Sequence, residues 1–171
     1  MPAAKLRIDP HRDLELAAEH RAVRRAEAEL RRDYDTLDGL GERNFISTIA
    51  AILAEAVFRQ GRDAEAETLA AFSAEVAAPD DVETQFRWRQ VRAKVCARRG
   101  DADEALRLAE EAVALTLQTD DLSGQANAQR DLAEVLAAAG RAAEAETARV
   151  LATDLYELKG DIVSAAATRG E

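Results

Sequence analysis

Apolar residues between positions 44 and 158 recur three or four residues apart, as on one face of an α-helix. Trp88, Val91 and Val95 show this spacing, and no stretch alternates as a β-strand does. The pattern predicts an all-α fold of antiparallel helical hairpins. The predicted first helices of the hairpins are 44–60, 83–99 and 122–139, and the predicted second helices are 63–77, 102–119 and 142–158.

The three hairpins align on a glycine, and Gly61, Gly100 and Gly140 stand 39 and 40 residues apart. A small alanine lies seven residues before each glycine, a glutamate four after it and a second alanine five after it. These positions are Ala54, Ala93 and Ala133, then Glu65, Glu104 and Glu144, then Ala66, Ala105 and Ala145.

Each aligned column has a physical reason. Glycine ends a helix where a left-handed backbone is needed. Alanine permits close approach where two helices cross, and the acids Asp63, Asp101 and Asp103 cap the second helices or favour their starts. Chain breaks at 79–81 and 119–121 separate the hairpins.

The two ends of the chain differ from the repeats. Residues 11–38 contain no glycine or proline, and Leu16, Val23, Leu30 and Leu37 fall seven apart, which predicts one long helix with an apolar stripe. This helix is either the last helix of a preceding, degraded repeat or a homodimerisation helix. We therefore expect an N-terminal helix and linker over 1–43, three hairpins over 44–158 and a capping helix and tail over 159–171.

Composition narrows the function classes. The chain is 47% hydrophobic but 4% aromatic, so thin alanine-rich cores between neighbouring helices are expected. A net charge of -10 argues against nucleic-acid and membrane partners, because phosphate repels an acidic surface. The single cysteine allows no internal disulfide, and the N-terminus has no signal-peptide core, so a cytoplasmic location is expected.

Enzymatic constellations are absent from the sequence. His11 and His20 are too far apart for a close metal pair, and Cys96 aligns with apolar positions of the other repeats, which predicts a buried packing residue. The chain has no GxxxxGK[ST] phosphate loop. We expect no catalytic site, no metal and no cofactor.

The aligned glycines and alanines resemble the tetratricopeptide repeat over residues 44–158. The period of 39–40 is longer than the usual unit of about 34, and the usual aromatic pair is mostly missing. The stretches 41–62 and 78–100 are similar to the C-terminal repeat region of bacterial class III adenylate/guanylate cyclase proteins with ATPase domains. That resemblance implies a right-handed solenoid, either a separate protein or the tail of a larger regulator.

The resemblance also implies which positions line a concave groove: those six before, three before, one after and five after the small alanine. In the middle repeat they are Arg87, Gln90, Lys94 and Arg98. The outer repeats supply Glu55, Arg59, Asn127, Arg130 and Glu134.

The helix segment 87–99 carries six basic residues and no acid, so the rest of the chain stands at -16 against a total of -10. Either this strip binds an acidic peptide or a carboxylate, or its cations pair with Glu55, Glu134 and the acidic second helices. The expected function is a non-catalytic scaffold that binds a peptide or protein in the groove. The alternatives are self-association through residues 11–38 and a regulatory fragment whose partner holds the catalytic site.

Overall fold

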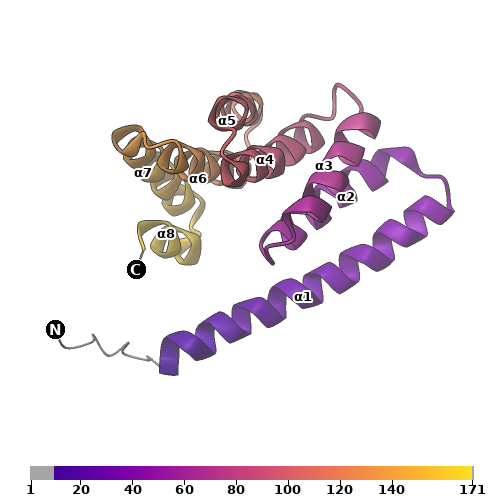
Figure 1. The fold of residues 1–171 in the computed structure, drawn as a ribbon, viewed down its shortest axis with the longest axis horizontal. Coiled ribbons are helices and arrows are strands. Elements are labelled where there is room, and N and C mark those ends of the chain that lie inside the picture. Colours follow the sequence, from indigo (N-terminus) through magenta and orange to yellow (C-terminus); the bar gives the residue numbers. More distant parts are fainter. Residues whose placement is uncertain (1–9, 171) are drawn as a thin grey trace.

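The computed structural model describes the backbone of residues 10–170 and the side chains of residue 18 and residues 20–170. This part of the chain is all-α, with eight helices and no strand (Figure 1). Each predicted helix is confirmed to within three residues. In chain order they are α1 (Pro10–Gly39), α2 (Arg43–Phe58), α3 (Asp63–Val76), α4 (Val82–Arg99), α5 (Ala102–Thr116), α6 (Leu122–Ala138), α7 (Ala142–Lys159) and α8 (Ile162–Arg169).

The predicted glycine turns are confirmed. Gly61, Gly100 and Gly140 join α2 to α3, α4 to α5 and α6 to α7 with φ of 76°, 84° and 75°. At the middle turn the Gly100 N–H donates to the Ala97 carbonyl at 3.1 Å and the Asp101 N–H to the Cys96 carbonyl at 3.0 Å. This pattern satisfies the last carbonyls of a helix when the next residue is left-handed.

The repeated alanines are buried where paired helices meet. Ala54 and Ala93 are 0% exposed, as are Ala66 and Ala105 in the partner helices. The first helices also touch one another, α2 against α4 and α4 against α6. Helices therefore pack mainly against near neighbours in the chain, with small apolar cores between them.

Aspartates set the helix starts. Asp81, Asp101 and Asp121 are the N-caps of α4, α5 and α6, and each side chain accepts a backbone N–H of the first turn. Asp63 and Asp103 lie inside the first turns of α3 and α5, where the helix dipole favours negative charge.

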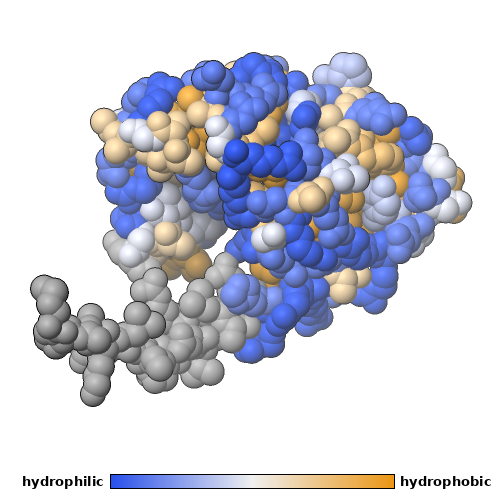
Figure 2. Space-filling view, in the orientation of Figure 1, coloured by the Kyte–Doolittle hydropathy of each residue, from blue (hydrophilic) through white to orange (hydrophobic). Residues whose placement is uncertain are grey.

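Hydrophilic side chains cover most of the face in Figure 2, with smaller hydrophobic patches between them.

The second half of α1 packs on the first hairpin. Leu30 and Tyr34 lie against the largest apolar core, and the Tyr34 ring meets the Phe72 ring edge-on with centroids 5.8 Å apart. This is the packing expected of a preceding repeat's last helix. Between residues 20 and 26 every side chain is exposed except the half-buried Val23, and the side chain of Leu16 lies outside the described residues.

At the other end α8 packs on α7 through Ala165, which is buried with Ala126, Ala152 and Tyr156. Asp161 caps this helix through the Ser164 N–H. Among the described helices, none combines the length and the apolar character that crossing a membrane requires.

Glu27 fastens α1 to the first hairpin. Its buried carboxylate lies 2.5 Å from Arg62 Nη2, accepts Gln60 Nε2 at 2.7 Å and accepts Arg31 Nε at 2.8 Å. The hydrogen bond from Arg62 contributes most to lowering the pKa of Glu27 from 4.5 to about 2, although burial acts in the opposite direction.

Glu27→Gln should destabilise the protein by about 1.5–3 kcal/mol at pH 7, since it removes the charged acceptor. Because the folded-state pKa is lowered, this stabilisation is full above about pH 4.5 and is lost as the pH falls through about 2. Urea unfolding of both proteins across this range, followed by circular dichroism, measures the difference.

Glu29→Gln is the matched control, because Glu29 is exposed on the same helix and, among the described residues, forms its ion pair with Arg25. Its effect should stay below about 0.5 kcal/mol at every pH. If the difference in the free energy of unfolding between the wild-type protein and Glu27→Gln does not decrease in acid, the stabilising role assigned to the ionised Glu27 is wrong.

Candidate functional site

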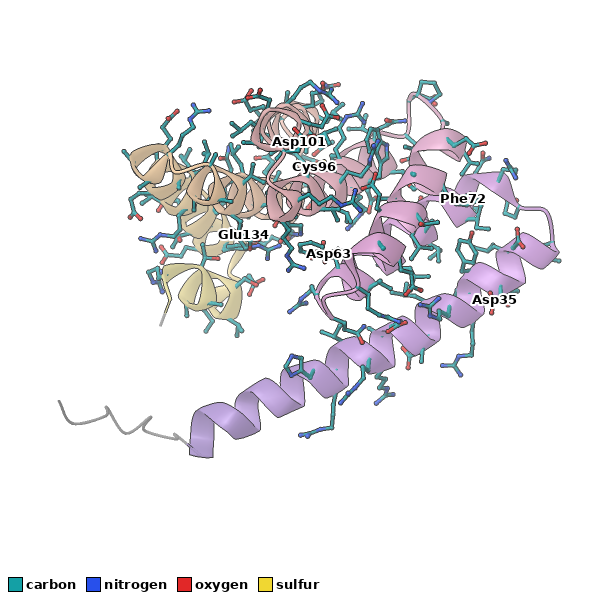
Figure 3. All side chains as sticks on the ribbon, in the orientation of Figure 1. Asp35, Asp63, Phe72, Cys96, Asp101 and Glu134 are labelled. Carbon is teal, nitrogen blue, oxygen red and sulfur yellow. The ribbon has the colours of Figure 1, made fainter. Side chains whose placement is uncertain are left out.

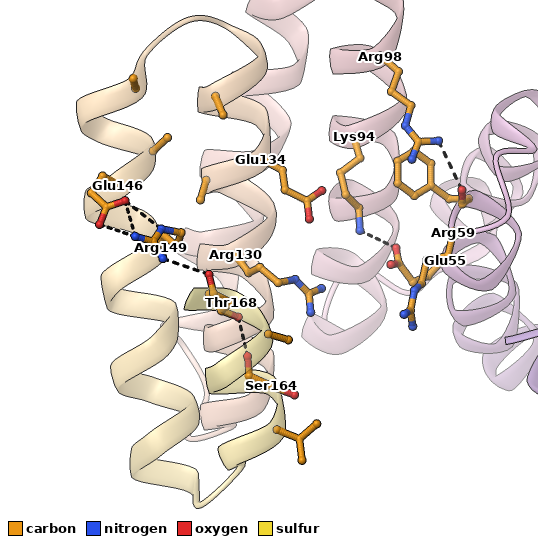
Figure 4. Close-up of a pocket in the computed structure, with 17 residues that line it drawn as sticks. Glu55, Arg59, Lys94, Arg98, Arg130, Glu134, Glu146, Arg149, Ser164 and Thr168 are labelled. Atoms are coloured by element: carbon orange, nitrogen blue, oxygen red, sulfur yellow. Dashed lines mark hydrogen bonds and ion pairs between the residues drawn. The ribbon is translucent and has the colours of Figure 1, made fainter. Parts of the chain in front are cut away.

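A cleft of about 870 Å³ lies between the first helices and the C-terminal end of the chain. Helices α2, α4 and α6 form one side and α7 and α8 the other (Figure 4). Its basic lining residues are Arg59, Lys94, Arg98, Arg130 and Arg149, and its acidic lining residues are Glu55, Glu134 and Glu146.

Lys94 lies at the floor of the cleft and is 4% exposed. Its Nζ lies 2.7 Å from Glu55 Oε2 on α2 and 3.0 Å from Asp131 Oδ2 on α6, so one ammonium on α4 joins three helices. Desolvation alone would lower the pKa of Lys94, but the charges of Asp131 and Glu55 outweigh it and raise the pKa. Lys94 is therefore charged at every physiological pH.

Arg130 extends this network towards α7. Its guanidinium donates to Asp131 Oδ1 at 2.9 Å and to the Tyr156 hydroxyl at 3.2 Å, and that hydroxyl donates to Asn127 Oδ1 at 2.6 Å. Burial opposes the charge on Arg130, but Asp131 outweighs it and raises the pKa. Asp131, buried between Lys94 and Arg130, thus balances two cations.

Arg98 stands at the edge of the cleft near α2. Its guanidinium lies 3.7 Å from the Phe58 ring centroid, and its Nη1 lies 2.6 Å from Asp63 Oδ1. Arg59 lines the same edge and is exposed. Since the Arg98 side chain is almost half exposed, its pair with Asp63 is screened by water and weak.

Glu134 projects into the cleft from α6 (Figures 3 and 4). No side chain in the described residues forms a hydrogen bond or ion pair with it, whereas Glu55 pairs with Lys94 and Glu146 with Arg149. Although the Glu134 side chain reaches solvent, the surrounding walls desolvate it and Asp131 repels its charge, and both raise its pKa. Glu134 therefore takes up a proton more readily than an ordinary carboxyl group.

The wall formed by α7 and α8 was not foreseen from the sequence. Arg149 pairs with Glu146 at 2.6 Å and donates to the Thr168 carbonyl at 3.3 Å, which ties α7 to α8. Ser164 and Thr168 complete this side. Arg149 stands four residues after the buried Ala145, and this helical spacing was the indication in the sequence that Arg149 faces the cleft.

Of the nine predicted groove positions, six line the cleft: Glu55, Arg59, Lys94, Arg98, Arg130 and Glu134. The other three, Arg87, Gln90 and Asn127, do not. Arg87 pairs with Glu83 one turn earlier at 2.7 Å. Gln90 is buried, and its Nε2 has no hydrogen-bond partner among the described residues. Asn127 is occupied by the Tyr156 hydroxyl.

Other cations of the basic strip pair with acids on the second helices. Arg92 meets Glu67 on α3 at 3.0 Å, and Arg89 meets Glu111 on α5 at 3.0 Å. The strip is therefore divided: its outer arginines neutralise neighbouring helices, and only Lys94 and Arg98 reach the cleft.

Cys96 is buried, as its alignment predicted, and lies on α4 in the main apolar core (Figure 3). Desolvation, and then the charge of Glu67, raises the pKa of its thiol. His20 is exposed on α1, and the side chain of His11 lies outside the described residues.

Neither the models of known protein families nor the curated proteins contain a match to this chain.

A double-mutant cycle on Lys94 and Asp131 tests the buried network. Lys94→Met removes the cation from between Glu55 and the buried Asp131 and should cost about 3–5 kcal/mol in the free energy of unfolding. Adding Asp131→Leu should recover about 1–3 kcal/mol relative to the sum of the single variants, because the pair is removed together. Strict additivity in urea unfolding would show that the two groups do not interact.

Proposed function

We propose that the chain is a non-catalytic protein-interaction scaffold, built as a tetratricopeptide-like right-handed solenoid, that holds an acidic peptide segment in its cleft. Three helix pairs with the same glycine turn and the same buried alanines support the repeat architecture. The contacts of α2 with α4 and of α4 with α6 also support it, because stacked repeats bring their first helices side by side.

The charge of the cleft is the observation that supports an acidic peptide as the ligand. Five basic and three acidic side chains line it, on a chain of net charge -10. Asp131 and Asp63, which pair with three of these cations, are not among the lining residues. A local excess of cations on an acidic protein attracts an acidic segment and repels basic ones. Guanidinium groups also bind carboxylates in a two-point geometry.

The existing ion pairs in the cleft do not oppose this function. Arg98 with Asp63 and Arg149 with Glu146 are partly exposed pairs, each worth at most about 1 kcal/mol. A ligand carboxylate can replace Asp63 or Glu146 at small cost. Lys94, held at the floor by Glu55 and Asp131, contributes a fixed positive charge.

The similarity of residues 41–62 and 78–100 to the repeat region of cyclase–ATPase proteins extends this proposal. The chain then acts in the cytoplasm as the repeat tail of a cyclase–ATPase regulator, or as a separate protein of that kind, and a partner holds any catalytic site. The cleft supplies the contact by which such a tail recognises its partner.

Neutralising the cleft rim should weaken binding of an acidic peptide. The probe is a fluorescein-labelled peptide of alternating glutamate and leucine, with a glutamine counterpart as the uncharged control. Arg98→Gln with Arg149→Gln should raise its Kd about tenfold, with a reduced dependence on salt. Fluorescence anisotropy measures both.

Arg99→Gln is the matched control, since Arg99 adjoins Arg98 but is exposed outside the cleft. It should bind the probe as the wild-type protein does. Equal affinity of all three proteins, or equal binding of the glutamine peptide, would overturn the ligand class. Affinity capture with the same proteins then identifies the cellular partner by mass spectrometry.

Self-association remains the alternative, and the exposed stretch of α1 is the observation that favours it. Deletion of residues 1–25 keeps Glu27 and its ion pairs, so the first hairpin should stay intact. If α1 is a dimerisation helix, light scattering should show a dimer before the deletion and a monomer after it. A monomeric full-length chain would exclude this alternative.

A further inference from the structure

A second pocket, of about 570 Å³, lies where α1 ends and α2 and α4 begin, and we call it the corner pocket. It shares no lining residue with the cleft. Leu37, Phe45 and Ile49 supply its apolar surface, and Asp33, Asp81 and Glu83 supply its charge. No basic residue lines it.

Phe45 is the exception among the aromatic rings. It lies at the start of α2 and is 69% exposed. No described side chain makes a ring contact with Phe45. The other phenylalanines and the tryptophan each have one within the chain: Arg98 over Phe58, Arg89 over Trp88, Arg87 beside Phe86 and Tyr34 against Phe72.

The carboxylates of the corner pocket are only partly engaged. Glu83 pairs with Arg87 at 2.7 Å, and Asp81 Oδ1 caps α4 through the Thr84 N–H at 3.1 Å. Neither Asp33 nor Asp81 has an ion-pair partner among the described residues. The pocket therefore combines a bare aromatic face with uncompensated negative charge, which is the environment that an arginine prefers.

We propose that the corner pocket docks a segment of a partner protein in which an apolar side chain of leucine size stands near an arginine. The apolar side chain fills the space between Leu37, Phe45 and Ile49. The arginine stacks on Phe45 and pairs with Asp33, as Arg98 stacks on Phe58 and pairs with Asp63 inside this chain. The preference is opposite in sign to that of the cleft, so the two surfaces bind different segments.

The test uses the full chain and a fluorescein-labelled peptide, Gly-Arg-Leu-Ala-Arg-Leu-Gly, in fluorescence anisotropy. Saturable binding is expected, and Phe45→Ala should weaken it at least about fivefold through loss of the ring and its apolar contact. Asp33→Asn should weaken it about threefold and flatten its salt dependence. Peptides with arginine replaced by glutamate, or leucine by serine, should bind more weakly than the parent.

Two matched controls separate docking from general effects. Leu117→Ala removes an exposed apolar side chain elsewhere, and Asp35→Asn removes an exposed acid of α1 that lies outside the pocket. Both should bind as the wild-type protein does. Absence of saturable binding up to millimolar protein, or equal loss in the controls, would overturn the proposal.

Light scattering gives a further outcome. If the wild-type chain is a dimer and Phe45→Ala is a monomer, a second copy covers the pocket and the proposed foreign segment is wrong. A wild-type chain and a Phe45→Ala variant of the same mass leave the pocket open to the partner segment, as proposed. Because Phe45 and Asp33 do not line the cleft, none of these results depends on the acidic-peptide function.

Discussion

A buried ammonium group constrains the centre of this protein. Lys94 is removed from water, and a charge in that position is tolerated only with close counter-charges. Glu55 and Asp131 supply them from the helices on either side, so α2, α4 and α6 must keep one relative register. The same register brings Arg98 and Arg130 to the surface above Lys94 and so creates the charged cleft.

The thin cores explain why such a polar constraint is needed. Alanine at the helix crossings allows close approach but buries little area for each contact, so apolar packing alone leaves neighbouring repeats weakly specified. An ion pair between repeats has a narrower geometry than an alanine contact. The role of Lys94 in fixing how the repeats stack is thus complementary to the role of the alanines in bringing them together.

Local rules made the helices predictable. Glycine turns, buried alanines and the burial of Cys96 follow from contacts within one repeat, and the sequence alone indicated all three. The groove was predictable only in part, because it depends on how repeats meet. The repeat alignment correctly put Lys94 and Arg98 on the groove side of α4. Gln90 stands on the same face but is buried, because α4 is covered along that stretch. The wall formed by α8 follows from tertiary packing at Ala165, which no periodicity reports.

The charge distribution shows why net charge is a poor guide to what each surface binds. The chain is acidic overall, yet the cleft gathers cations and the corner pocket gathers acids, on opposite ends of α2. Over distances longer than the Debye length of about 10 Å, salt screens one surface from the other, so each acts through its own local field. In the cleft this field also depends on Glu134, because its raised pKa lets it take up a proton more readily than an ordinary carboxyl group. The positive charge of the cleft therefore increases when Glu134 is protonated.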